Sequence, residues 1–299
     1  MSILVRRGRA LGLAALVLLA GCATTPDAPA TPDTPAEPGT TEETTAEPTE
    51  EPSSTESPTP TETAAADRTS VYFVVDTRAG FRLTREPHAL TGDPAVAALE
   101  VMIAGPEDPD YATTWNPATE VLSVTQVDGE WVVDLSGDAR TANVGSEGAA
   151  LMIQQLVWTV TEAVGEPDAA VVLTIDGAPA GEMWGAIEVA TPETRADALD
   201  VRNTVQIDNL TEGDAVTSPV LVTGEAAVFE AVLLWRVLDA AGETVADGMT
   251  MTSEGQTFAP YSFEVALDPG KWTIVVEETD PSDGEGGPVM TDSRTVTVG

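Results

Sequence analysis

The segment EVLSVTQVDGEWVVDL, residues 120–135, decides how the first half of this chain folds. Apolar and polar side chains alternate on both sides of the pair Asp128-Gly129. An Asp-Gly pair between two alternating segments is the strongest short signal for a β-hairpin. The segment therefore predicts two antiparallel strands, Glu120–Val127 and Glu130–Leu135, joined by a tight turn.

Helical patterns flank this hairpin on both sides. Upstream, Asp93-Pro94 supplies an N-cap and a proline at the first helical position, and Gly105-Pro106 ends the predicted helix after Ala104. Downstream, Ser146 is the predicted cap of a second helix, whose apolar face holds Ala149, Met152, Ile153, Leu156, Val160 and Ala163. Strands at 70–76 and 170–175 complete the order β-α-β-β-α-β, a small sheet with helices packed on it.

After residue 199 only strand patterns remain. Turn signals separate seven short segments, which we place near 204–208, 219–226, 229–238, 244–251, 257–266, 271–278 and 292–298. Regular short strands of this kind are typical of a β-sandwich. The predicted fold class is therefore α+β, with an α+β domain at 68–198 and an all-β sandwich at 199–299.

The amino terminus predicts export and a lipid anchor. Three arginines precede 11 apolar residues, 10–20, a run too short to cross a bilayer as a helix. Residues 1–21 are therefore a predicted signal peptide. The sequence Leu19-Ala20-Gly21-Cys22 resembles the lipobox of bacterial lipoproteins, which implies cleavage before Cys22 and acylation of its thiol, for example with palmitate. The predicted location is the extracytoplasmic face of the cell membrane; the alternative is a plain signal peptide with an incidental cysteine.

Residues 22–67 have the composition of a disordered stalk. Between residues 23 and 67 the chain has 9 Pro, 13 Thr and 11 acidic residues, with no aromatic, Val, Leu, Ile or basic residue. Such a segment cannot bury enough apolar surface to offset the entropy of ordering. We expect it to hold the two domains away from the membrane.

Three segments of the α+β domain resemble the GerMN domain of spore-germination and sporulation proteins. They are Ala98 to Pro106, Val121 to Ser136 and Gln154 to Gly177. The resemblance covers residues 68 to 190 and is carried mostly by helix ends and hairpins. It implies association within envelope assemblies, in a family that is not known for enzymes.

The all-β domain carries a second resemblance. Ser218-Pro219 to Ala226, Phe229 to Ala231, Arg236-Val237, Gly242 and Phe263 are similar to the immunoglobulin-like domain that commonly follows GerMN. The resemblance implies a sandwich without paired cysteines, in which Trp235 or Trp272 fills the core.

Charge and composition exclude several functions. The net charge of −37 excludes nucleic acid as a partner. With one histidine, His88, and one cysteine, the chain cannot build a His/Cys metal cluster. Neither a Gly-x-Ser-x-Gly motif nor a phosphate-binding glycine loop is present. We expect no enzyme activity and no cofactor. The alternative is a cell-wall hydrolase that uses an unrecognised pair of carboxylates.

Four cationic or potentially cationic groups gather in a short segment that we expect to be a loop: Arg78, Arg82, Arg85 and His88. One hypothesis is that they bind an anionic partner, such as a wall polymer or an acidic protein surface. The other is that they pair with local carboxylates and stabilise the loop. Both remain open at this point.

Asp280, Asp283 and Glu285 form an oxygen-rich loop beside Gly284. Such loops can bind calcium, although the spacing of an EF-hand is missing. The alternative is a solvated turn. The leading prediction is therefore a non-catalytic, lipid-anchored protein that binds or scaffolds envelope proteins or wall polymer. A calcium-dependent adhesion module is a further alternative.

Overall fold

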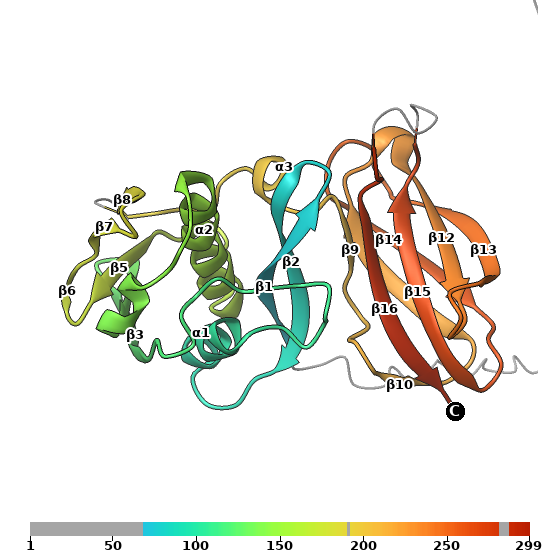
Figure 1. Ribbon diagram of the computed structural model, residues 1–299, viewed down its shortest axis with the longest axis horizontal. Coiled ribbons are helices and arrows are strands. Elements are labelled where there is room, and N and C mark those ends of the chain that lie inside the picture. The colour runs from blue at the N-terminus through green and yellow to red at the C-terminus, as the bar shows by residue number, and fades with distance from the viewer. Residues whose placement is uncertain (1–67, 190–191, 281–286) are drawn as a thin grey trace, which may run out of the picture. The chain divides into compact units, whose positions relative to one another are not determined.

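The computed structural model describes residues 68–189, 192–280 and 287–299 (Figure 1). These residues belong to one compact unit, Pro60–Gly299. The predicted signal peptide, the stalk and the lipidation of Cys22 lie outside the described residues, and so do Asp283 and Glu285. Within the described part of the chain, no helix is both long and apolar enough to span a bilayer.

The first domain is α+β, as predicted. Its elements in chain order are β1 (Arg68–Thr77), β2 (Gly80–Ala89), α1 (Pro94–Ala104), β3 (Val121–Val127), β4 (Glu130–Leu135), α2 (Ser146–Ala163), β5 (Val171–Ile175), β6 (Ala178–Pro179), β7 (Gly181–Met183) and β8 (Ile187–Val189). Strands β3, β4, β5 and β6 form one sheet, in which β4 and β5 run parallel because α2 crosses between them. The β3–β4 hairpin confirms the prediction made from Asp128-Gly129.

Strand β2 was missed by the sequence prediction, which placed a loop there. Residues 80–89 pair with β1 along its whole length in a separate two-stranded antiparallel sheet. The strand does not alternate in the usual way, because it buries Thr84 and Glu86 as well as Leu83. The first domain therefore has the order β-β-α-β-β-α-β, followed by short strands, and more than one sheet.

The helix starts differ in how they are capped. The side chain of Asp93 accepts hydrogen bonds from the backbone N–H of Ala95 at 3.0 Å and of Val96 at 3.1 Å, which confirms the predicted cap of α1. Helix α2 begins at Ser146 but is capped by Gly145, without a side-chain hydrogen bond. The predicted capping role of Ser146 was therefore wrong.

The helices α1 and α2 lie between the β1–β2 sheet and the four-stranded sheet (Figure 1). The main core of the first domain joins Phe73 of β1, Leu99 and Met102 of α1, Leu156 of α2 and Leu135 of β4, all of them buried. The other face of β1 packs Tyr72 against Trp158 of α2. Strand β1 is therefore covered on both faces.

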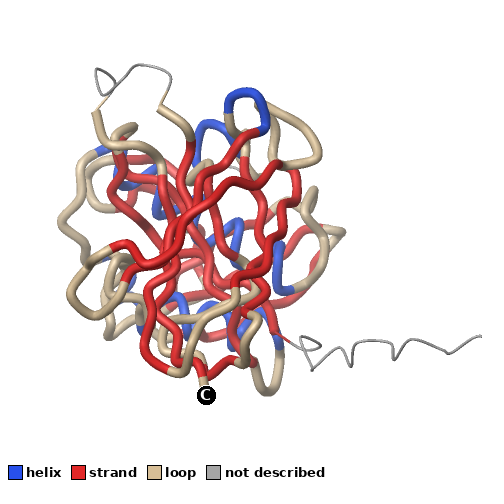
Figure 2. Tube along the Cα trace, turned by 90° about the vertical axis from the view of Figure 1, so that its right-hand side faces the viewer, coloured by secondary structure: helices blue, strands red, loops and turns tan. Residues whose placement is uncertain are grey.

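The second domain is the predicted sandwich. Its strands are β9 (Val205–Ile207), β10 (Ala215–Val216), β11 (Val220–Ala226), β12 (Val232–Leu238), β13 (Thr244–Met251), β14 (Ala259–Val265), β15 (Gly270–Glu278) and β16 (Thr291–Val298), and the short helix α3 (Ala198–Val201) precedes them. One sheet has the order β10-β16-β15-β12-β13 and the other β14-β11-β9. Figure 2 shows these strands, in red, crossing the face turned toward the viewer.

The two sheets enclose a core of their own. Val222 of β11, Leu233 of β12, Ile274 of β15 and Val296 of β16 are fully buried there. Trp235 and Trp272 are half-buried against this core, and Trp235 stacks on Phe263 with ring centroids 4.9 Å apart. The seven predicted strands correspond to observed ones, and only the two-residue strand β10 was missed.

Candidate functional site

The junction between the two domains is built from ion pairs. Arg85 of β2 donates two hydrogen bonds to Asp208, which follows β9, at 2.8 and 2.7 Å. The same guanidinium lies 2.8 Å from Glu225 of β11. Burial raises the pKa of Asp208, and the charge of Arg85 offsets part of this effect. A two-point arginine–carboxylate contact fixes orientation as well as distance.

A second arginine lies in the connection between the domains. The side chain of Arg202 is 5% exposed and bonds to both Gln206 and Glu225. Its guanidinium carbon lies 4.2 Å from the ring centre of Phe258 in the second domain and 5.3 Å from that of Trp158 in the first. Aromatic faces attract a buried cation, so Arg202 links one ring of each domain.

The third arginine is the most buried. Arg294 of β16 is fully buried and lies 3.0 Å from Asp108 of the first domain and 2.8 Å from Asp292. Asp292 also accepts hydrogen bonds from the hydroxyl of Tyr111 and the backbone N–H of Ile207. Burial raises the pKa of Asp108 to about 6, against the opposing effects of a backbone hydrogen bond and of Arg294.

Three of the four cationic residues singled out in the sequence are paired with carboxylates, two of them across this junction. Arg85 is held as described, Arg78 lies 2.6 Å from Glu278 of β15, and His88 lies 3.0 Å from Glu86. Burial by itself would raise the pKa of the Glu86 carboxyl, because it disfavours the charged form. Hydrogen bonds from His88 and from two backbone N–H groups outweigh this effect and lower its pKa. All three pair within the chain, but only His88 has a local partner; Arg78 and Arg85 pair with carboxylates of the other domain rather than with the local ones that the sequence suggested.

Arg82 is placed differently. Its guanidinium donates to the carbonyl of Phe81 at 2.9 Å, and no ion pair within the described residues includes it. Both residues line a groove of the first domain with a volume of about 1020 Å³. Binding of an anionic partner by the four-residue group remains a prediction, and Arg82 is the member that faces this groove.

The groove lies between four segments, three within the first domain and one where the chain leaves that domain. They are the end of the β1–β2 hairpin, residues 109–114, the start of α2, and Ile187 together with residues between 193 and 201. Its apolar lining includes Val74, Phe81, Val144, Leu151, Ile153, Ile187 and Val201, and its carboxylates are Asp76, Asp110, Glu147, Glu193 and Asp200. Because Phe81 is 55% exposed, the groove presents an uncovered aromatic ring to solvent.

Comparison with known proteins identifies both domains. Residues 70–181 match the family described as sporulation and spore germination. Residues 204–285 match the family described as an immunoglobulin-like domain of bacterial spore germination. The chain is a GerMN domain followed by a spore-germination immunoglobulin-like domain. Both resemblances stated from the sequence are therefore confirmed, and neither family description names an enzymatic activity.

Solved structures give further similarities. The first GerMN domain of the sporulation protein GerM from Bacillus subtilis is 21% identical, covers 44% of this chain and 98% of its own, and has a TM-score of 0.36. The tandem GerMN domains of the same protein are 15% identical over 67% of this chain and 62% of theirs, with a TM-score of 0.35. CopC from Methylosinus trichosporium OB3b is 20% identical over 29% of this chain and 84% of its own, with a TM-score of 0.23. A search of curated proteins found no match.

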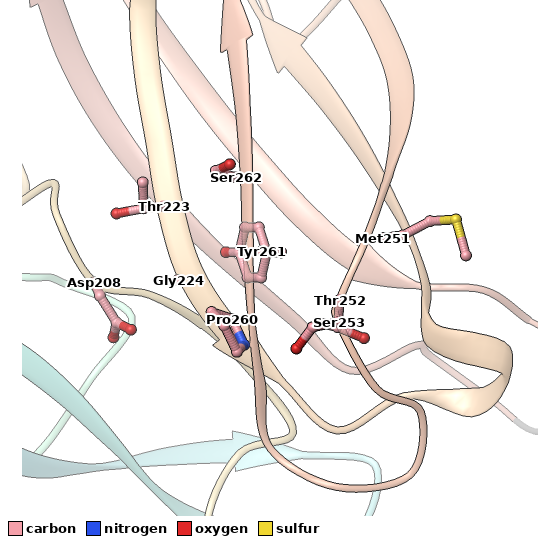
Figure 3. A pocket seen from close by; sticks show the side chains of 9 residues that line it. All are labelled: Asp208, Thr223, Gly224, Met251, Thr252, Ser253, Pro260, Tyr261 and Ser262. Carbon is pink, nitrogen blue, oxygen red and sulfur yellow. The ribbon is translucent and has the colours of Figure 1, made fainter.

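The immunoglobulin-like domain has a hollow of about 650 Å³ near β11 and β14 (Figure 3). Its hydroxyl groups come from different segments and are spread along it, on Thr223, Thr252, Ser253, Tyr261 and Ser262. Its one carboxylate, Asp208, is already bound by Arg85, and the hydroxyl of Tyr261 donates to the carbonyl of Gln206 at 2.9 Å. The hollow therefore offers no converging set of reactive groups.

Calcium binding and stacking of sugars on Trp115, Trp131, Trp158 or Trp184 are two further roles that these residue types allow. No group of three or more His, Cys, Asp or Glu residues in the described ranges is placed to hold a metal ion. Two of the three calcium candidates fall outside those ranges, and Asp280 has an interaction of its own. In the GerMN domain Trp115 and Trp158 are buried, which removes them as sugar-stacking surfaces.

Sequence reasoning missed most of the junction. Asp108, Tyr111, Asp208, Asp292 and Arg294 are ordinary polar residues in the sequence, without a motif around them. Arg294 and Asp108 are 186 positions apart, so only the folded chain brings them together. The one available signal was the scarcity of basic residues, 13 against 50 acidic ones, because a rare cation in an acidic chain has many partners that can bury it.

Proposed function

We propose that this protein is a non-catalytic, lipid-anchored envelope protein whose GerMN and immunoglobulin-like domains act as one rigid head that binds another envelope component. The observation that carries the proposal is the buried junction, in which Arg85, Arg202 and Arg294 each contact groups on the other side. Separating the domains would leave the buried charges of Arg294 and Asp108 without each other, which is costly. The junction therefore favours one orientation of the two domains.

The proposed absence of catalysis rests on where the perturbed groups lie. Displaced pKa values often mark active sites, because catalytic acids and bases need them. Here Asp108, with a pKa raised to about 6, is 2% exposed and faces Arg294. Asp208 is held by Arg85 in the same junction. Asp108 is enclosed in the contact between the domains, so a substrate would have to separate them to reach it, and the carboxylate of Asp208 is occupied by Arg85.

The proposed anchor rests on the sequence alone. Leu19-Ala20-Gly21-Cys22 supplies the acylation site, and the acidic segment at 22–67 separates it from the head. Two acyl chains hold a protein stably at a membrane, since each buried methylene contributes roughly 0.8 kcal/mol. The head would then face the extracytoplasmic space, where an envelope protein or a wall polymer is within reach.

The test is a crosslinking capture from living cells. The full-length chain is compared with residues 1–67 alone, which keep the anchor and stalk but lack both domains. The expected result is one or more envelope components that crosslink reproducibly to the full chain and not to the shorter one. Identical capture by both would refute a binding role for the head, and lysis of purified cell wall by the full chain would refute the non-catalytic part.

A further inference from the structure

The groove of the GerMN domain combines an apolar floor with an acidic rim. Val74, Leu151 and Ile153 belong to its lining, and Phe81 stands at its edge with more than half of its surface exposed. Among the residues that line it, five are acidic and one is basic. The groove is therefore complementary to a partner that carries apolar and positive groups together.

Arg82, the one basic residue of the lining, leaves the groove acidic. The carboxylate of Glu147 and the guanidinium of Arg82 both lie near Gly80, at 3.7 and 3.9 Å from the position that a Cβ atom would occupy there. Arg82 therefore shares its neighbourhood with a carboxylate. Asp76 and Asp200 remain on the exposed rim.

A free backbone edge lies in the same groove. Val74 of β1 exchanges both of its backbone hydrogen bonds with Ala112, at 2.8 Å each. In an antiparallel ladder the N–H and C=O groups of alternate residues point to the same side. The backbone groups of Asp76 therefore point in the same direction as those of Val74. The bridge ends at Val74, and no hydrogen bond in the described ranges engages the N–H or C=O of Asp76 from that side. One donor and one acceptor are thus available beside the groove.

We propose that this groove binds an extended peptide segment that alternates apolar and basic side chains and pairs with the backbone of Asp76. A strand directs alternate side chains to opposite faces, so apolar residues would enter the floor while lysine or arginine residues meet the rim. The proposal deepens the proposed function, on which it rests, by naming the kind of partner that the head recognises. The peptide belongs to a separate envelope protein with a basic segment.

The first test is binding of a defined probe to the full-length chain. The probe is a fluorescein-labelled ten-residue peptide of alternating lysine and valine, and its anisotropy is measured at physiological salt. Two comparison peptides alternate glutamate with valine and lysine with serine. We expect at least tenfold weaker binding for both, because one loses the charge and the other loses the apolar side chains.

A matched pair of variants locates the binding. The groove variant combines Asp76→Asn, Glu147→Gln and Asp200→Asn, and the control variant combines Glu100→Gln, Asp168→Asn and Glu264→Gln. All six residues are exposed, and both variants lose three negative charges. The groove variant should bind the probe at least tenfold more weakly, and the control should bind like the parent chain. Equal binding by both variants would reduce the effect to diffuse charge attraction and overturn the proposal.

A modified probe tests the backbone pairing. Methylation of every second backbone nitrogen removes the donors from one edge of the peptide while its side chains stay in place. Two such peptides, methylated in opposite registers, should differ, since only one loses the edge that faces Asp76. Equal affinities would overturn strand pairing.

A crosslinking experiment in cells separates this proposal from the proposed function. A photoreactive benzoylphenylalanine replaces Phe81 in the groove or Met249, a residue of β13 that is 68% exposed. Crosslinks from position 81 to a basic segment of an envelope protein would support the groove. Crosslinks from position 249 alone would overturn the groove proposal while the head still binds a partner. If the probe binds as expected but the full chain captures no more than residues 1–67 do, the groove proposal stands as a peptide site and the proposed function fails.

Discussion

Replacement of Arg294 by methionine keeps a long side chain in the junction but removes the charge that Asp108 and Asp292 face. Arg294 is fully buried, and its two carboxylate partners are 2% and 1% exposed. Removing one partner of a buried ion pair leaves an uncompensated charge and typically costs about 3–5 kcal/mol. In a folded unit of this size, 1 kcal/mol shifts the melting temperature by about 2–4 °C, so Arg294→Met should lower it by about 6–20 °C.

The loss should depend on pH in a defined direction. Burial already raises the pKa of Asp108 to about 6, and the positive charge of Arg294 opposes that rise. Without the arginine, the carboxylate of Asp108 in the folded variant takes up its proton at higher pH than it does in the unfolded chain. Folding is then favoured by protonation, so the variant should be least stable relative to the parent near pH 8 and recover part of the difference near pH 5.

Calorimetry at pH 5 and pH 8 measures both effects, and Arg236→Met is the matched control. Arg236 forms an ion pair with Glu277 at 3.3 Å, but its side chain is 44% exposed. An exposed pair of this kind contributes about 0–1 kcal/mol. If Arg294→Met costs no more than Arg236→Met, or if its cost is the same at both pH values, the junction does not stabilise the protein through buried charge.

Three further outcomes follow from other residues. The folded-state pKa of Asp108, about 6, lies above its ordinary 3.8, so its stabilising contribution is complete below pH 4 and is lost as pH rises through 6. The substitution Asp108→Asn should remove this pH-dependent loss of about 3 kcal/mol in the free energy of unfolding. The stability measured by urea unfolding should then depend less on pH. Gly224→Ala should cost about 1–3 kcal/mol or more in the same assay, because its Cβ would lie 1.9 Å from the backbone oxygen of Gln206 and strands β9 and β11 would have to separate. Cys22→Ser should abolish incorporation of a palmitate analogue and release the protein from the membrane fraction; a labelled serine variant would contradict the anchor.

The elements that the sequence predicted correctly depend on local chemistry. Asp128-Gly129 forms a tight turn because of its own backbone preferences, and Asp93 caps α1 through bonds to residues two and three positions later. Such signals lie within a few residues of the structure that they specify. The turn pairs and alternating segments of the immunoglobulin-like domain work in the same way, and its strands were therefore placed within a few residues.

Strand β2 could not be found in this way. Its buried residues include Glu86, which is held by the backbone N–H groups of Glu107 and Asp108, and its half-buried Arg85 is held by Asp208 from the other domain. A run of polar and charged residues predicts a loop as long as the partners that bury it are unknown. The groove was equally hidden, since it is lined by segments drawn from residues 74 to 201. Of the candidate binding residues named from the sequence and lying in the described ranges, Arg82 alone lines it.

The placement of arginines in the junction has a consequence for the kinetics of association. The chain has few positive charges, and Arg85, Arg202 and Arg294 face carboxylates within the fold. The outer surface is therefore left with a large excess of negative charge. A basic partner would be drawn from a distance of about one Debye length, roughly 8 Å at physiological salt, before any contact forms. Its rate of capture should fall steeply as ionic strength rises, while its rate of release, set by apolar contacts, should change little.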